Sequence, residues 1–197
     1  SYIMAKNKKN KNIPANEISK ELERINSNEK EKVIFSFDFL DRHHELFNMG
    51  DNKNNPLSTE VGWFLDLLDC LNNVSKMTRI EFKNNKTYDL HPVNWKGANV
   101  PCPTDMEQYE WWQFRINKSK GRIVGIFIEN CFHIVWLDRH HNLTNSEGYG
   151  NENYYKTPLS LYESQEWELS QAYNRIKELE EENSTYKYLF DYKEGLR

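Results

Sequence analysis

The tetrapeptide Asp-Arg-His-His occurs twice in this chain, at residues 41–44 and 138–141, each time after an apolar run that ends in leucine. Histidine is suited to acid–base chemistry near neutral pH and to metal binding. A zinc or non-haem metal site could combine one histidine from each copy with Asp38, Asp41 or Asp138. Adjacent histidines on a strand point to opposite faces, so each copy offers at most one side chain to a shared centre. The repeat is therefore compatible with a metal site, an acid–base site, or two similar strand ends.

The best candidate for phosphate binding is a basic hairpin. All charged residues between positions 111 and 128 are basic: Arg115, Lys118, Lys120 and Arg122. Guanidinium and ammonium groups bind phosphate through charge-assisted hydrogen bonds. The net charge of the whole chain is −4, so a contact with RNA would need a local patch of this kind.

Tryptophans flank the basic hairpin and could stack on exposed RNA bases. Alternation along a strand places only one of Trp111 and Trp112 in the core, and we expect the other at the mouth of the site. Trp95 and Trp111 therefore join Lys118 and Lys120 as candidate RNA-binding residues.

A small sheet must position these residues. The segments "EWWQFRI", "GRIVGIFI" and "CFHIVWLD" predict three consecutive antiparallel strands over residues 111–138, the last two joined by a tight turn. An earlier strand is predicted over residues 33–40, and a helix over about residues 59–74 carries Trp63, Leu67 and Leu71 in one stripe. The pattern predicts an α+β domain, in which helices pack on one face of a small antiparallel sheet.

The chain divides into three zones. Residues 1–32 form a basic Lys/Asn-rich tail with a short helix, residues 33–157 the α+β domain, and residues 158–197 an acidic helix. Apolar residues at spacings of three and four place Asn183 in the seam of the last zone, which is typical of a parallel dimeric coiled coil. Two interpretations stay open: a homodimer through residues 165–190, or a single helix docked on its own domain.

The composition predicts a cytoplasmic protein. The three cysteines are isolated, without the spacing of a zinc site or a redox pair. No apolar run approaches the roughly 20 residues that cross a bilayer, and no signal-peptide segment is recognisable, so we expect no membrane partner.

The segment "FRINKSKGRIVGIFIENCFHIVWLDRHHNL" resembles the C-terminal half of the RelE/YoeB family of bacterial ribonuclease toxins. With the preceding strand and helices, the resemblance covers roughly residues 33–145. The long loop over residues 87–103 and the two terminal extensions depart from the family, whose members are usually much shorter.

The resemblance implies a metal-independent and cofactor-independent endoribonuclease, used in toxin–antitoxin systems or antiviral growth arrest. Its partners would be RNA, including ribosome-associated mRNA, and an antitoxin or another protein. Arg115 and Arg122 would stabilise the scissile phosphate, His140 or His141 would act as the general acid, and Glu81 would act as the base. Two alternatives are a non-catalytic adaptor that recruits partners through its extensions and a His-dependent metal-binding protein.

Overall fold

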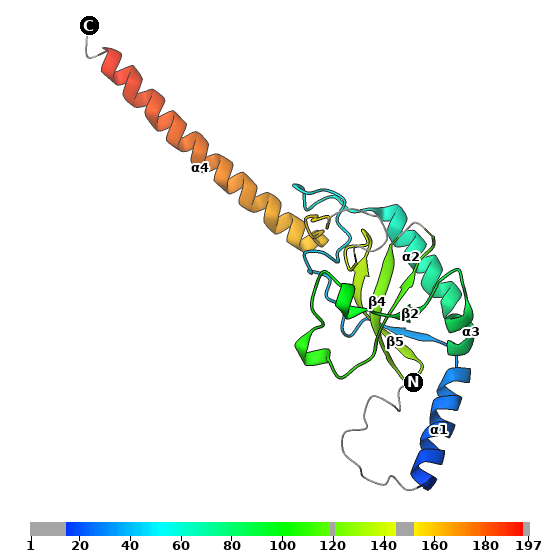
Figure 1. Ribbon diagram of the computed structural model, residues 1–197. Coiled ribbons are helices and arrows are strands. Elements are labelled where there is room, and N and C mark those ends of the chain that lie inside the picture. Colours follow the sequence, from blue (N-terminus) through cyan, green and yellow to red (C-terminus); the bar gives the residue numbers. More distant parts are fainter. Residues whose placement is uncertain (1–14, 119–120, 145–151, 195–197) are drawn as a thin grey trace.

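The computed structural model describes residues 15–118, 121–144 and 152–194. The elements in chain order are α1 (Ala15–Lys30), β1 (Ile34–Ser36), α2 (Val61–Val74), α3 (Arg79–Asn84), β2 (His91–Pro92), η1 (Trp95–Gly97), η2 (Thr104–Met106), β3 (Trp111–Arg115), β4 (Arg122–Ile128), β5 (Cys131–Asp138) and α4 (Leu161–Glu194). Figure 1 shows α2 beside the sheet and α4 leaving the domain as a single rod. The helix predicted in the N-terminal tail is present as α1.

The strands form one five-stranded sheet in the order β1-β5-β4-β3-β2. β3, β4 and β5 are consecutive antiparallel neighbours, which confirms the prediction for residues 111–138. β1 pairs with β5 in parallel, so the predicted small antiparallel sheet is a mixed sheet with one parallel edge strand. Parallel neighbours need a long crossover connection, and here the connection contains α2, α3 and the strands β2, β3 and β4.

β1 is shorter than the strand predicted over residues 33–40. The Ser36 hydroxyl accepts a hydrogen bond from the Asp38 amide at 3.1 Å, and the Leu40 amide donates to the Phe37 carbonyl at 3.0 Å. These bonds turn the chain out of the sheet. Phe37 and Phe39 are consequently exposed.

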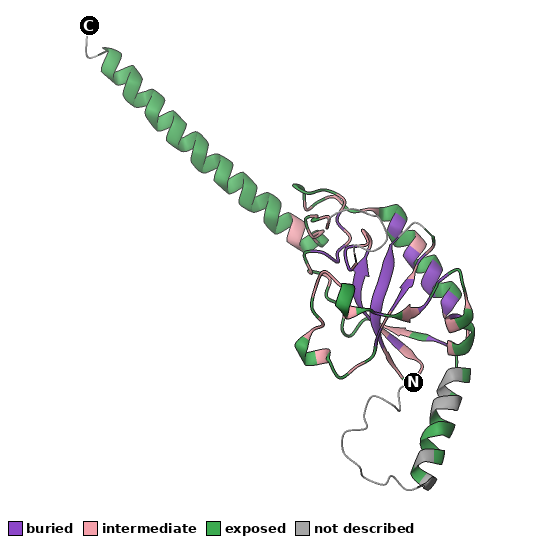
Figure 2. Cartoon of the chain, in the orientation of Figure 1, coloured by how far each residue is buried: buried purple, intermediate pink, exposed green. Residues whose placement is uncertain are grey.

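Helices α2 and α3 cover one face of the sheet, which confirms the α+β class. Trp63, Leu67 and Leu71 of α2 are buried as predicted, and Phe82 of α3 lies in the same cluster. The cluster includes sheet residues of that face: Phe114, Ile123, Phe132, Ile134 and Leu137. Figure 2 shows buried positions on α2 alternating with exposed ones, as expected for an amphipathic helix.

Loops, rather than helices, cover the opposite face. Its cluster joins Trp111 of β3, Val124 of β4 and Trp136 of β5 to Phe47 and Leu143 from the connecting segments. Both faces of the central strands are therefore covered, which explains why β4 and β5 are nearly continuous apolar runs.

α4 is an exposed arm. None of its 34 residues is buried, and every residue from 165 to 194 is exposed. The interpretation of this helix as docked on its own domain was therefore wrong. Among the helices of the described residues, none has the length and apolar character of a membrane span.

Candidate functional site

Four charged residues lie in a row across one end of the sheet. Arg115 on β3 is directly opposite Arg122 on β4, which is opposite Asp138 on β5. On the other side of the row, Arg115 Nη2 lies 2.8 Å from Asp89 Oδ2. Directly opposite residues share a face, and like charges in such positions repel each other. The two outer carboxylates offset the repulsion between the two central arginines.

The residues of this row differ in how far they are buried. The Arg115 side chain is 26% exposed, whereas Arg122 is 5% exposed and Asp138 is 0% exposed. The predicted role of Arg122 in contacting the scissile phosphate therefore conflicts with its burial, because RNA cannot reach this guanidinium in the folded domain. Lys118 is exposed beyond the end of β3, while Lys120 lies outside the described residues.

His140 and His141 lie in the turn that follows β5, at the same end of the sheet as the arginines. His140 stacks on Tyr155 at a ring separation of 4.1 Å, and its Nε2 lies 3.2 Å from the Gly50 carbonyl. Burial is the main cause that lowers the pKa of His140, so this imidazole is predominantly neutral at pH 7. His141 has a positive φ of 58° and both of its ring nitrogens are buried. Neither histidine is presented openly to a substrate.

Glu81, the predicted base, is remote from these histidines. It forms the capping box of α3: Thr78 N donates to Glu81 Oε2 at 2.7 Å, and these hydrogen bonds with Thr78 lower the Glu81 pKa. The neighbouring Arg79 donates to the Glu129 carbonyl in the β4–β5 turn, at the far end of those strands. Because β5 has 8 residues, its two ends are about 25 Å apart. The prediction that Glu81 shares a centre with His140 was wrong.

Trp111 and Trp95 belong to the loop-covered core. Their rings meet edge to face at 5.4 Å, and Trp111 Nε1 donates to the Met106 carbonyl at 3.2 Å. Trp111 is buried, so its proposed role as a surface for stacking bases was wrong; Trp95 is half-buried against it. Trp112 points to the helix-covered face, where Lys83 Nζ lies 5.4 Å from its ring centre.

The two tetrapeptides follow the neighbouring strands β1 and β5 at the same end of the sheet. As many residues separate Ile34 from its partner Cys131 as separate Asp41 from Asp138, so the repeat has the same spacing as the parallel pairing within β1 and β5. The Asp41 amide donates to the Val135 carbonyl at 3.0 Å, whereas the register of β1 with β5 would pair it with the Leu137 carbonyl. The turn after β1 therefore displaces the first copy along β5, so the two copies are similar in sequence but do not occupy equivalent positions.

The first arginine of the repeat anchors α4. Arg42 Nη1 donates to the Pro158 carbonyl at 2.8 Å, and Arg42 Nη2 donates to Glu163 Oε2 at 3.0 Å. Glu163 lies in the first turn of α4 and also accepts a hydrogen bond from the Ser160 amide at 2.6 Å. The bonds from Ser160, followed by those from Arg42, lower the Glu163 pKa to about 2.

The second arginine makes the corresponding contacts at the start of α2. Arg139 Nη1 donates to the Gly50 carbonyl at 2.8 Å, and Arg139 Nη2 donates to Glu60 Oε2 at 3.2 Å. Glu60 is the N-cap residue of α2. Each arginine thus binds one backbone carbonyl and one carboxylate at the start of a helix. From the sequence, only the histidines and aspartates of the repeat were candidates for a site, and the arginines were missed. Ser160 and Glu163 have the spacing of a capping box, so the start of the last helix could have been predicted.

The histidines of the first copy do not join those of the second in a metal centre. His44 stacks on Phe47 at 4.5 Å and its Nδ1 accepts the Leu46 amide, whereas His43 Nε2 lies 3.9 Å from Glu163 Oε1. Within the described parts of the chain, no group of three or more His, Cys, Asp or Glu side chains could hold a metal ion. The shared two-copy site is therefore not formed.

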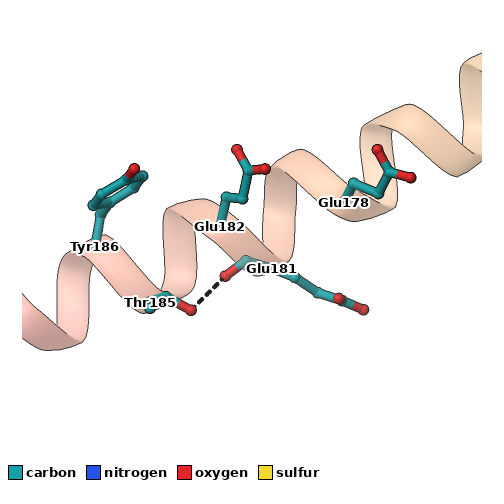
Figure 3. Close-up of a pocket in the computed structure, with 5 residues that line it drawn as sticks. All are labelled: Glu178, Glu181, Glu182, Thr185 and Tyr186. Carbon is teal, nitrogen blue, oxygen red and sulfur yellow. Dashed lines mark hydrogen bonds between the residues drawn. The ribbon is translucent and has the colours of Figure 1, made fainter.

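The outer surface of α4 has a shallow hollow, shown in Figure 3. Its lining residues are Glu178, Glu181, Glu182, Thr185 and Tyr186. All belong to one helix, so the hollow is an open helical face and not a cleft between elements.

Comparisons with protein-family models, curated proteins and solved structures found no match to this chain. The resemblance to RelE/YoeB toxins therefore stays a hypothesis that rests on the sequence.

Proposed function

We propose that this protein is a non-catalytic interaction protein, whose α+β domain holds the helical arm α4 ready for a protein partner. The observation that carries this proposal is the exposure of every residue from 165 to 194 in a long helix with many apolar residues. Leu169, Ile176, Leu179 and Phe190 are all exposed on it. An apolar surface of this extent on a soluble domain is typical of an interaction site.

Helix energetics support a partner for the arm. In proteins, most helical stability comes from packing of an apolar face rather than from intrinsic propensity. Residues 165–194 have no such packing within their own chain. Binding of the apolar residues to a partner would supply it.

The anchor of the arm supports the same function. Arg42 and Ser160 both hold Glu163, so the direction of α4 is fixed where it leaves the domain. Because the Glu163 pKa is lowered to about 2, its carboxylate stays charged throughout the physiological pH range. The contribution of the anchor to stability is present above the ordinary glutamate pKa and is lost only as the pH falls toward about 2.

The test is site-specific photo-crosslinking of the full chain in its host cell. A photoreactive phenylalanine at Leu179, on the apolar side, should form a defined adduct with one protein, identified by mass spectrometry. The matched control is the same group at exposed Glu181, about 160° around the helix. Equally weak adducts at the two positions would show that the arm is unoccupied and would overturn the proposal.

Two further variants separate binding from catalysis. An adaptor should keep its adduct when His141 is replaced by alanine. Removal of residues 160–197 should abolish partner binding while leaving the folded domain, because the arm contributes no buried residue. Loss of binding in the His141 variant with an intact fold would instead point to the domain.

A ribonuclease is the second candidate, favoured by the partly exposed Arg115 beside Lys118 at the same sheet end as His140. In that case Arg115→Ala should lower RNA cleavage by the full chain about 10²- to 10³-fold, the range for losing one group that stabilises transition-state charge. Arg24→Ala is the matched control, since Arg24 is also ion-paired but lies on α1. The adaptor predicts no cleavage that depends on Arg115.

A further inference from the structure

We propose that α4 binds the same helix of a second copy of this chain, in a parallel two-stranded coiled coil over residues 165–190. This inference rests on the proposed function, because it names the partner of the arm. The paired segment would be about 39 Å long at the usual helical rise.

The seam of the coiled coil is a continuous exposed stripe. In a heptad repeat abcdefg, the a and d positions face the partner helix. The a positions are Leu169, Ile176, Asn183 and Phe190, and the d positions are Ala172, Leu179 and Tyr186. All of them are exposed in the single chain. A second copy would cover this stripe over its whole length.

Charges beside the seam favour a parallel pair of identical helices. In that arrangement each g residue faces the e residue five positions later on the partner. Arg175 at g would face Glu180 of the second copy, and Glu182 at g would face Lys187 of the second copy. Both pairs have opposite signs and, by symmetry, each occurs twice. In the single chain Arg175 bonds Glu178 of its own helix at 2.9 Å, at the outer c position, and pairing with the second copy would exchange this partner for Glu180.

Asn183 specifies the register. In a parallel, in-register pair an a residue faces the same a residue, so the two Asn183 amides can hydrogen-bond to each other. A shifted or antiparallel pair would place this amide against an apolar residue and leave it unsatisfied. The position thus selects against alternative pairings at some cost in stability.

The close-up of α4 separates a seam residue from an outer one. In Figure 3, Glu182 and Tyr186 point to one side and Glu181 points away from them. Tyr186 is a d residue and Glu182 the flanking g residue, whereas Glu181 is at the outer f position. Glu181 is therefore a suitable control for changes in the seam.

The anchor at Glu163 has a consequence for the assembly. Because each arm leaves its domain at the N-terminal end of α4, parallel pairing brings the two domains to the same end of the coiled coil. An antiparallel pair would put them at opposite ends. The dimer is therefore expected to have both domains adjacent and one shared helical stalk.

The first experiment measures the mass of the full chain by sedimentation velocity over a range of concentrations. We expect a dimer that Leu179→Glu weakens by at least about 100-fold, since a charge would be buried in the seam. Glu181→Lys should leave the dimer unchanged. Arg175→Glu should weaken it, and the double variant Arg175→Glu, Glu180→Lys should restore it by exchanging the signs of the pair.

The second experiment tests orientation by disulfide trapping. Asn183→Cys should form an intermolecular disulfide rapidly under mild oxidation, because the two positions meet in a parallel, in-register pair. Glu181→Cys should not. Near-ultraviolet circular dichroism checks that each domain stays folded.

Three results would overturn the inference: a monomer at all concentrations, a dimer that Leu179→Glu does not weaken, or equal trapping of the two cysteine variants. A monomer whose Leu179 crosslinks to a different protein would refute the second copy as the partner while leaving the interaction function intact. A monomer with no adduct at Leu179 would refute both.

Discussion

Asp138 and Asp41 are the same residue of the same repeat, and we predict very different losses of stability when each is replaced by alanine. Asp138 is fully buried, and its two carboxylate oxygens accept the amides of Asn142 at 2.6 Å and Leu143 at 3.0 Å. Alanine would leave two buried amides without these acceptors, at about 1–3 kcal/mol each. It would also remove the negative charge opposite the buried Arg122.

Breaking a buried charge arrangement alone costs about 3–5 kcal/mol. These contributions overlap, so we expect Asp138→Ala to lower the free energy of unfolding by about 3–5 kcal/mol. Asp138→Asn keeps one oxygen acceptor and should fall between this variant and the wild type. Asp41 is exposed and accepts the His43 amide at 3.2 Å. Asp41→Ala should therefore cost less than about 1 kcal/mol.

The assay is urea unfolding of the full chain at pH 7, followed by tryptophan fluorescence from the core. The dependence of the free energy on urea should be unchanged, so that the shift in midpoint reports stability. Losses within about 0.5 kcal/mol of each other for the two alanine variants would refute the argument that the place in the sheet, and not the motif, determines the role of each aspartate.

Three further predictions use the same unfolding assay. Gly121 has φ +84°, and an added Cβ would lie 2.7 Å from the Arg139 backbone, so Gly121→Ala should cost about 2 kcal/mol. Gly97→Ala should cost close to zero, because its added Cβ would make an ordinary contact with the Asn94 side chain at 3.9 Å. Similar losses for the two variants would contradict this. Trp111→Ala should cost about 3–5 kcal/mol, the range for removing a buried aromatic ring, and a loss below about 1 kcal/mol would restore a surface role for it. Burial lowers the pKa of His140, so below pH 6.5 the unfolded chain binds more protons than the folded one, and the free energy of unfolding falls as the pH falls. His140→Gln should make this pH dependence shallower. An unchanged pH dependence would contradict the assignment of this effect to His140.

The strands and helices that depend on the spacing of apolar residues along the chain could be predicted from the sequence. The three antiparallel strands and the stripe of Trp63, Leu67 and Leu71 were readable, because strand alternation and helical spacing follow directly from backbone geometry. The parallel pairing of β1 with β5 was not readable, since it joins residues separated by the entire helical segment. Trp111 shows the same limit: alternation gives its face, but the loop that buries this face has no periodic pattern.

The predicted catalytic site was wrong for the same reason, because it depended on which distant residues meet in the fold. Glu81 and His140 each have a residue type suited to acid–base chemistry, but the sequence does not show that they lie at opposite ends of the sheet. The long contact between Arg42 and Glu163 was missed for the converse reason. Its two residues lie 121 positions apart, although the capping position of Glu163 was readable.

In the two copies of the tetrapeptide the arginines have the same role, whereas the aspartates have different ones. β5 is central and β1 is at the edge, so Asp138 is buried and Asp41 is exposed although the two copies follow neighbouring strands. The arginines do not depend on this difference, because each reaches a carboxylate at the start of a helix. Arg139 thereby fixes α2, which covers the sheet, and Arg42 fixes α4, which leaves it. The same end of the sheet therefore holds both the core helix and the exposed arm, so the arm is built into the domain at a defined position, as the proposed interaction function requires.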